Sequence, residues 1–545
     1  MQPCYRSYFK TFLTNRRKSR IISPAPEKMM SLLIAAIYKG NTFFLSLTPF
    51  EPGVAGSAPS TQIGSVLPVP FTSLILIFPW LTLLAGITLL LLVIFILARK
   101  DLRFARLRFK LEGIIHKRTE ELLSQKEKVD ELLSNMLPKE TAAQLKLTGK
   151  ASSRKYNMVT ILFSDIEGFT RIAEQMNPEI LVDELDKFFF HFDTLVEEFN
   201  IEKIKTIGDA YMAAGGIPDA NTTNPVDVVL AAIRIMQHMK RLKEEKENFW
   251  DLRIGIHTGP VIAGVVGQKK LSFDIWGDSV NTASRMESSG ESGQINISGS
   301  TFEYIKDFFV CEYRGKMPVK YKGNIDMYFV KGFRPEYSVD MKGEEPNHRF
   351  FTKLQFLRLR DLEEEYLRIM EDELPAALCF HNHKYCVDLL TRCELLASSE
   401  QLSEEERLAV LTAALFDCYS YIRGYGEREG YIDQLSREVF IKDKYTEKQA
   451  KDICDLLKTP LFPPTADSLP GMVLSDARLA FIGKPGLKET AEKLYEEMCS
   501  YGMVSSKEDF VKNMARQLHK FEFYTLTARK LSEVTPHQQS EHLMQ

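Results

Sequence analysis

The sequence predicts an α+β domain in the middle of the chain, with a membrane span before it and an all-α domain after it. Between residues 153 and 336, stretches with strand-like alternation are separated by stretches with apolar residues at helical spacing. From residue 350 to residue 531 helical spacing dominates. Phe71–Ala98 is a run of 28 residues without a charge, which exceeds the roughly 20 residues needed to cross a bilayer.

Composition narrows the class of protein. The 545 residues carry a net charge of −3, whereas a nucleic-acid-binding protein normally has a basic excess, so we expect no nucleic-acid partner. The eight cysteines include no CxxC pair, which argues against a disulfide framework or a zinc ribbon and favours a reducing compartment. A chain of this length is typical of about three domains.

The predicted membrane span at residues 71–98 is followed by a basic run, Arg99–Lys110. By the positive-inside rule, the part of the chain after the span is cytoplasmic, which places the protein in the cell membrane in contact with lipid. Residues 1–70 leave three alternatives, because their apolar stretch Met29–Phe50 is interrupted by Lys39. The stretch is compatible with a weak first span, with a signal sequence, or with a segment upstream of a true start at Met29 or Met30.

A helical linker is predicted at residues 99–145. Its apolar residues recur every seven positions at Ile115, Leu122, Val129 and Met136. This repeat is typical of a parallel coiled coil, which would join two copies of the chain. Arg118 and Gln125 occupy would-be core positions, so a solvated single helix is the alternative. Pro138 is expected to end the helix.

Two aspartates follow apolar strands in the central domain. Asp165 ends the predicted strand VTILFSD, and Asp209 ends the predicted strand in KIKTIGDAYM. Carboxylates that meet at one edge of a sheet can hold magnesium ions, although aspartates at strand ends also serve as helix caps. Gly168, in the following IEGFT, lies where backbone amides could approach an anion as a helix begins.

A third polar group lies in FDIWGDSVNTASRME, which contains Asp274, Asn281 and Arg285. Asn281 and Arg285 are four residues apart and therefore share one face of a predicted helix. An asparagine can bond a ribose oxygen, and an arginine fork can hold a charged phosphorus centre. Lys205 precedes Asp209 by four residues, so a regular strand would place both side chains on one face.

Four motifs together closely resemble those of the class III nucleotide cyclases: FSDIEGFT, KTIGDAYM, GIHTGPVIAGVVG and FDIWGDSVNTASRM. The resemblance covers about residues 156–333. It implies a ferredoxin-like βαββαβ core and head-to-tail homodimers with the active site at the interface. It also implies an enzyme of signal transduction that converts a nucleoside triphosphate to a cyclic nucleotide and pyrophosphate, with two Mg²⁺ or Mn²⁺ ions per site.

The resemblance assigns roles to the residues that match these motifs. Asp165 and Asp209 correspond to the metal ligands, with the Ile166 carbonyl assisting. Asn281 and Arg285 correspond to the catalytic pair that stabilises the transition state from the opposite subunit. The other matched residues are expected to contact the nucleotide: Gly168, Phe169, Thr170, Lys205, Asp274, Lys269 and Lys320. For the last two lysines, the neighbouring Lys270 and Lys322 are alternatives.

Lys205 and Asp274 match the pair that reads the purine. A lysine only donates hydrogen bonds and an aspartate carboxylate only accepts them, which fits N1 and N6 of adenine. Family members that make cyclic GMP typically carry Glu together with Cys or Ser at these positions. The sequence therefore predicts an adenylate cyclase that uses ATP, with a guanylate cyclase or a nucleotide-binding signalling scaffold as the alternatives.

The helical part, residues 350–531, resembles the HD superfamily of metal-dependent phosphohydrolases over about 130 residues. The family motifs require His, His-Asp and Asp, whereas this chain has Tyr385, Asp417-Cys418 and Asp476 at those positions, with His381 and His383 nearby. Without the His-Asp pair we expect a degenerate, non-catalytic domain; phosphohydrolase activity is the alternative. Residues 532–545 are expected to form a disordered tail.

Overall fold

A computed structural model describes residues 71–544, apart from 246–248, 268–269, 320–322, 424–427, 461 and 463. The ambiguous stretch Met29–Phe50 lies outside the described residues, as do Lys269, Lys320 and Lys322. The chain divides into two compact units, one that ends at Ile114 and one that begins at Ile115. We describe each unit by itself.

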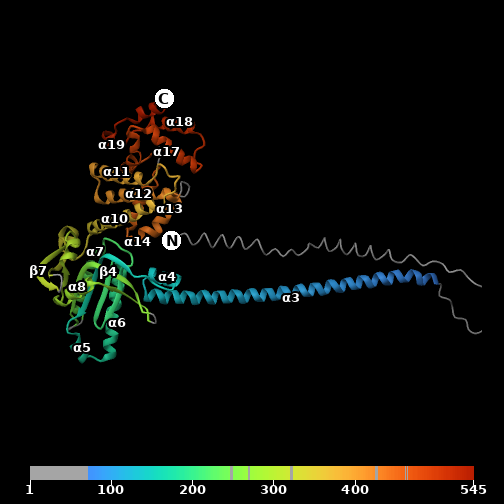
Figure 1. Ribbon diagram of the computed structural model, residues 1–545, viewed down its shortest axis with the longest axis horizontal. Helices are drawn as coiled ribbons and strands as arrows, with labels where there is room; N and C mark the ends of the chain where they lie inside the picture. The colour runs from blue at the N-terminus through green and yellow to red at the C-terminus, as the bar shows by residue number, and fades with distance from the viewer. Residues whose placement is uncertain are drawn as a thin grey trace, which may run out of the picture. The chain divides into compact units, whose positions relative to one another are not determined.

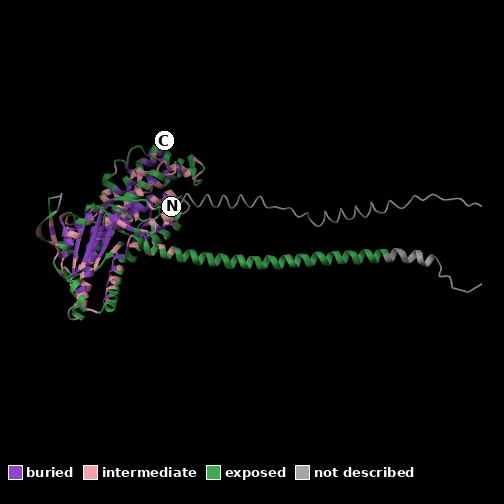
Figure 2. Cartoon of the chain, turned by 60° about the horizontal axis from the view of Figure 1, so that its bottom comes forward, coloured by how far each residue is buried: buried purple, intermediate pink, exposed green. Residues whose placement is uncertain are grey.

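The predicted span and most of the predicted linker belong to one continuous helix, α3 (Phe71–Met136), of 66 residues (Figure 1). Among the described residues, α3 is the one helix that is long and apolar enough to cross a membrane. Figure 2 shows that its described side chains are almost all exposed. As predicted, the helix ends before Pro138, after which the short helix α4 (Lys139–Thr148) begins.

The central domain contains an eight-stranded sheet, as the α+β prediction requires. Its strands are β1 (Arg154–Ile166), β2 (Ile201–Ile207), β3 (Ala210–Gly215), β4 (Leu252–Val266), β5 (Ser272–Trp276), β6 (Ile295–Ser298), β7 (Phe309–Val319) and β8 (Gly323–Phe333). Seven strands follow the order β2-β3-β1-β4-β6-β8-β7, and β5 pairs with β4. All pairs are antiparallel except the parallel pair of β4 and β6.

Helices cover both faces of this sheet. The alternation of side chains along β1 sends Leu162 and Ile166 into one core and Ile161 and Phe163 into another. The first core is closed by α6 (Pro178–Glu198), α7 (Asn224–Glu245) and α9 (Gly299–Ile305). The second is closed by α4 and α8 (Asp278–Ser288), so the sheet is buried on both sides (Figure 2).

The part after the sheet is helical, as predicted. Its α-helices are α10 (His348–Glu373), α11 (His383–Ser399), α12 (Glu404–Arg423), α13 (Arg428–Gln434), α14 (Phe440–Lys442), α15 (Glu447–Leu457), α16 (Leu469–Arg478), α17 (Leu487–Ser500), α18 (Lys507–Leu518), α19 (Leu526–Leu531) and α20 (Pro536–Met544). The prediction of a disordered tail at 532–545 is wrong, because α20 buries Leu543 in the helical core. Gln539 also donates hydrogen bonds to the carbonyls of Ile482 and Lys484, so this polar segment is held by partners that its own sequence does not reveal.

Helix α10 belongs to both cores, so residue 350 does not separate two independent domains. Phe350 and Leu354 pack in the core beneath the sheet, whereas Leu362 and Met370 pack in the helical core. Between them, Arg358 forms a largely buried ion pair with Asp227 of α7, at 3.2 Å. The shared helix ties the helical part to the sheet domain within one compact unit.

Candidate active site

The structure brings Asp165 and Asp209 together, although they are 44 residues apart in sequence. Asp165 lies near the end of β1. Asp209 does not end a strand as predicted, because β2 ends at Ile207 and Asp209 lies in the turn that leads to β3. Gly208 adopts φ +65° in this turn, a conformation that favours glycine. The prediction that strand alternation relates Lys205 to Asp209 therefore fails, since the turn, not the strand, directs Asp209.

The two carboxylates disturb each other's ionisation. Burial raises the pKa of Asp209, and the charge of Asp165 and a hydrogen bond shared with it raise this pKa further. Backbone amides, including that of Ile166, oppose the shift by hydrogen bonding to the ionised form. Without a cation, ionisation of Asp209 is therefore less favourable than that of an ordinary aspartate.

The donor set of this pair fits a divalent metal ion. Mg²⁺ and Mn²⁺ prefer hard oxygen ligands, and two adjacent carboxylates supply them. A bound cation would remove the like-charge repulsion from Asp165 that contributes to the raised pKa of Asp209. The backbone amide of Ile166 hydrogen-bonds to Asp209, whereas the metal contact of the Ile166 carbonyl stays a prediction.

We expect Mn²⁺ to raise the Tm of the protein, because a ligand that binds only the folded state stabilises it. The rise should grow as the pH increases from 3.8, the usual pKa of this carboxyl group, through the raised pKa of Asp209, since the cation then has fewer protons to displace. Without metal the sign is opposite: the folded state holds this proton more tightly than the unfolded chain does, so the free energy of unfolding falls over the same pH range. Thermal unfolding with and without Mn²⁺ measures both effects.

Asp209→Asn should abolish most of the Mn²⁺-dependent rise in Tm, because asparagine removes the ligand charge but preserves the side-chain shape. Asp186→Asn, at an exposed position on α6, is the matched control. An equal rise in Tm for both variants and for the unmodified protein would show that the metal binds elsewhere.

Arg253 and Glu287 complete the electrostatic surroundings of the carboxylates. Arg253 is the cross-strand partner of Asp165 on β4, and its Nη2 donates to Oδ2 of Asp165 at 2.8 Å. The same Nη2 lies 3.2 Å from Oε1 of Glu287 on α8. Burial raises the pKa of Glu287 to about 7; Arg253 lowers this pKa, whereas Asp165 and Asp209 raise it. Arg253 therefore orients Asp165 and offsets part of the negative charge.

Neither Arg253 nor Glu287 was predicted from the sequence. Arg253 stands in DLRIGIHTG, beside a quoted motif but outside it. Its role depends on the antiparallel register that places it opposite Asp165. Glu287 follows Arg285 by two residues, and only the packing of α8 on β4 brings it near Arg253.

Lys205 and Asp274 meet although they come from different strands. Nζ of Lys205 on β2 lies 2.6 Å from Oδ2 of Asp274 on β5. Oδ1 of Asp274 also accepts from the backbone amide of Ile275, at 2.9 Å. Both side chains are partly exposed, at 41% for Lys205 and 21% for Asp274, so a ligand can reach them. The predicted purine-reading pair is thus assembled within one chain.

Asn281 and Arg285 both lie on α8, as predicted, but the structure does not join them to the carboxylates of their own chain. Asn281 is exposed and Arg285 is half-buried. Among the described residues, neither side chain makes a hydrogen bond or an ion pair. Their role toward the opposite subunit stays a prediction.

The position of α8 depends on Gly255 of β4. A Cβ atom at residue 255 would lie 1.9 Å from the backbone nitrogen of Glu287. The absence of a side chain therefore allows the backbone of α8 to approach the sheet closely, which fixes the helix that carries Asn281 and Arg285.

Gly255→Ala should therefore displace α8. We expect the free energy of unfolding to fall by about 1–3 kcal/mol, as in other overpacked cores. We expect turnover to fall by about 10²-fold, because displaced catalytic groups lose alignment. Chemical denaturation and steady-state kinetics measure the two effects. Gly430→Ala, at an exposed helical position where a Cβ would have nothing within 4 Å, should change neither by a comparable amount.

Gly168 immediately precedes the short helix α5 (Phe169–Gln175) and adopts φ +70°. Phe169 packs partly against the core, whereas Thr170 is exposed. The first amides of a helix have no acceptor within it, so those of Phe169 and Thr170 can face an anion close to Asp165 in sequence. Lys269 and Lys320, the other predicted phosphate contacts, lie outside the described residues.

In the helical part, the two aspartates that the HD resemblance singles out both make internal contacts. Asp417 forms a buried ion pair with Arg478, at 2.9 Å. Asp476 accepts from the backbone amides of Tyr524 and Thr525, at 2.9 and 2.7 Å. Within the part of the chain that the structure describes, no three His, Cys, Asp or Glu side chains come together as metal ligands.

Comparison with known proteins matches residues 151–332 to the family model of the adenylate and guanylate cyclase catalytic domain. Guanylate cyclase 32E of Drosophila melanogaster is 37% identical over 239 residues, which are 43% of this chain and 21% of that protein. An adenylate cyclase of Mycobacterium bovis is 37% identical over 225 residues, which are 41% of this chain and 51% of that protein.

Among solved structures, the catalytic core of a rhodopsin-guanylyl cyclase with converted specificity, in complex with ATPαS, is 36% identical. The match covers 33% of this chain and 97% of that chain, with a TM-score of 0.31. Of the two relatives above, this chain spans about a fifth of the Drosophila protein and about half of the mycobacterial one. Every predicted site residue lies within residues 151–332.

Proposed function

We propose that this chain, whose residues 151–332 form a nucleotide cyclase catalytic domain, is a membrane-anchored adenylate cyclase that acts as a homodimer. The observation that carries the proposal is the β2–β3 hairpin. Its first strand holds Lys205 against Asp274, and its turn holds Asp209 against Asp165. One hairpin thus links a pair suited to adenine with a pair suited to the metal ions of a triphosphate.

In the proposed reaction, the ribose 3′ oxygen of ATP forms a bond to the α-phosphorus. The bond from that phosphorus to the bridging oxygen breaks, pyrophosphate leaves with the bonding electrons, and the hydroxyl proton is released to solvent. When bound at Asp165 and Asp209, two Mg²⁺ or Mn²⁺ ions supply charge neutralisation and acidify the 3′ hydroxyl. Asn281 orients the ribose, and Arg285 stabilises the charge on the pentavalent phosphorus.

The choice of ATP rests on Lys205 and Asp274. Proteins named adenylate cyclase and proteins named guanylate cyclase share this domain. The family alone therefore does not decide which purine base the substrate carries. The ion pair between Lys205 and Asp274 presents one donor and one acceptor side by side, which complements N1 and N6 of adenine. Guanine presents the opposite order of donor and acceptor on the same edge.

Exposed apolar groups near the site support the proposed homodimer. Ile262, Val266 and Trp276, on the paired strands β4 and β5 that carry Asp274, are 47%, 58% and 38% exposed. Apolar residues grouped on a surface are typical of an interface. The heptad residues Leu122 and Val129 of α3 are also exposed, which supports a coiled coil between two copies.

The membrane anchor is the apolar part of α3, and we place the sheet domain and the helical part in the cytoplasm because Arg99–Lys110 follows it. For the helical part we propose a degenerate, non-catalytic HD-like domain. Support comes from Asp417 and Asp476, since ion pairing and backbone hydrogen bonds already occupy their carboxylates.

The test is turnover by the full chain, expressed in membranes and supplied with Mn²⁺ and either ATP or GTP. We expect cyclic AMP from ATP and much less cyclic GMP from GTP. A preference for GTP would identify a guanylate cyclase, and failure to turn over either nucleotide despite binding would identify a scaffold. Asp209→Ala should eliminate the product; persistent cyclic AMP formation in that variant would contradict the metal assignment.

A further inference from the structure

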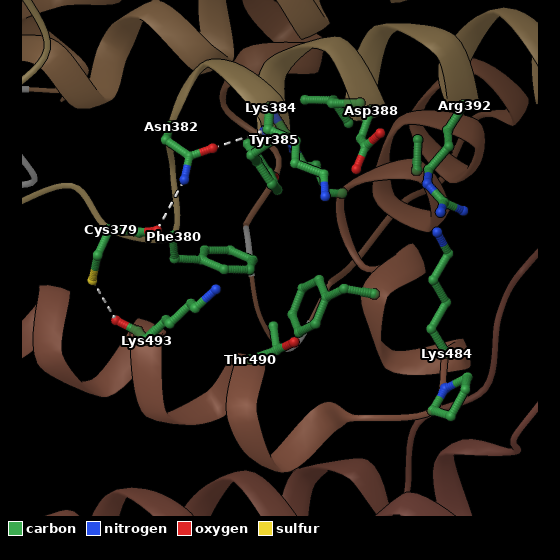
Figure 3. Close-up of a pocket in the computed structure, with 15 residues that line it drawn as sticks. Cys379, Phe380, Asn382, Lys384, Tyr385, Asp388, Arg392, Lys484, Thr490 and Lys493 are labelled. Atoms are coloured by element: carbon green, nitrogen blue, oxygen red, sulfur yellow. Dashed lines mark hydrogen bonds between the residues drawn. The ribbon is translucent and has the colours of Figure 1, made fainter.

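The helical part contains a cavity of about 250 Å³ that the cyclase reaction does not use. It lies between the start of α11 and the segment from α16 to α17 (Figure 3). This volume is close to the lower end of the range for small-molecule sites. The cavity is therefore large enough for a ligand rather than for a few water molecules.

The lining of the cavity is strongly basic. It contains one carboxylate, Asp388, and five cationic side chains: Lys384, Arg392, Arg478, Lys484 and Lys493. Figure 3 shows Arg392 and Lys484 extending toward one another from opposite sides. Among the described residues, Lys384, Arg392, Lys484 and Lys493 form no ion pair, and Asp388 is the one carboxylate in the lining beside these cations.

Arg478 lines the cavity, but its side chain is engaged within the helical core. Its side chain is 2% exposed, and its Nε donates to Asp417 at 2.9 Å. Its Nη2 is buried and has no hydrogen-bond partner among the described residues, and it is not accessible from the cavity. Arg478 therefore adds positive charge beside a ligand but no hydrogen bond to it.

One wall of the cavity is aromatic. Phe380 and Phe481 pack edge to face with ring centroids 5.1 Å apart, and both line the cavity. Tyr385 lies beside Phe380, at a centroid distance of 5.1 Å. Aromatic walls beside cations suit a ligand that has a flat ring and an anionic group.

We propose that this cavity binds a small aromatic phosphate, such as a nucleoside monophosphate. Its phosphate is held by Arg392 and Lys484, and its ring lies against Phe380 and Phe481. Asp388 disfavours ligands with many negative charges. The site is separate from the cyclase residues, and its ligand is bound without being hydrolysed.

The test is titration calorimetry on the full chain in detergent, with adenosine 5′-monophosphate as the probe and ribose 5-phosphate and inorganic phosphate as partial probes. We expect adenosine monophosphate to bind at least about tenfold more tightly than either partial probe. Arg392→Glu and Lys484→Glu should each weaken its binding by at least about tenfold, because they reverse a charge at the phosphate. Lys484 is exposed and Arg392 is partly exposed, so folding should be preserved.

Two controls locate the binding. Lys488→Glu reverses the charge of an exposed lysine on α17 that does not line the cavity and should leave binding unchanged. Asp209→Ala, which disables the proposed cyclase site, should also leave it unchanged. The proposal is wrong if no probe binds at millimolar concentration, or if Arg392→Glu and Lys484→Glu bind adenosine monophosphate as the unmodified chain does.

Discussion

Mixing chains that carry Asp165→Ala with chains that carry Arg285→Ala should restore cyclase activity that neither variant has alone. Each single variant should lose about 10³-fold or more, because one removes a metal ligand and the other removes the arginine that stabilises the transferring phosphorus. In a mixed dimer, one of the two active sites combines the intact Asp165 of one chain with the intact Arg285 of the other. The second active site contains both defects.

Equal mixing makes half of the dimers mixed, and each has one intact site of two. We therefore expect about one quarter of the unmodified activity. The control is a mixture of Asp165→Ala with Asp209→Ala chains, in which neither of the two active sites retains both carboxylates. If the first mixture is no more active than the second, Arg285 acts within its own chain and the shared-site dimer is wrong.

Exchanging the base-reading pair should change the substrate. We expect Lys205→Glu combined with Asp274→Cys to lower kcat/KM for ATP by about 10²-fold or more and to raise it for GTP. The glutamate accepts from N1–H of guanine, and the lysine that donated to N1 of adenine is gone. The ratio of the two kcat/KM values, measured on the same preparation, gives the switch in specificity.

The matched control for this exchange is Lys203→Gln, two residues earlier on β2, where the lysine pairs with Asp193 at the surface. This variant should keep the preference for ATP. A double variant that retains the same ATP to GTP ratio as the unmodified chain would show that the Lys205–Asp274 pair does not read the purine.

Several features were predictable because they depend on short stretches of sequence. The charge-free run at 71–98 predicts a helix that can span a bilayer, because the length and apolar composition of a segment are enough to make this prediction. Pro138 correctly predicts the end of α3. The apolar run before Asp165 predicts β1 as a buried strand, and the spacing of Asn281 and Arg285 predicts that α8 carries both on one helix.

Other features could not be predicted because they depend on contacts between distant segments. The contact of Arg253 with Asp165 exists only in the register of β1 with β4. The tail at 532–545 is polar, and its helix is stabilised by a core built from earlier residues. The shared helix α10 shows no break in its pattern where it passes from one core to the other.

The sequence by itself determined which groups could do chemistry: the carboxylates of Asp165 and Asp209, the donor and acceptor of Lys205 and Asp274, and the arginine of α8. These identities are local, because side-chain type and spacing are set along the chain. The tertiary structure alone decided which groups meet. The turn at Gly208 directs Asp209 toward Asp165, and the close approach at Gly255 fixes α8 against the sheet. Folding also gathers five cationic side chains and one carboxylate around the helical cavity, since this grouping depends on three-dimensional neighbours.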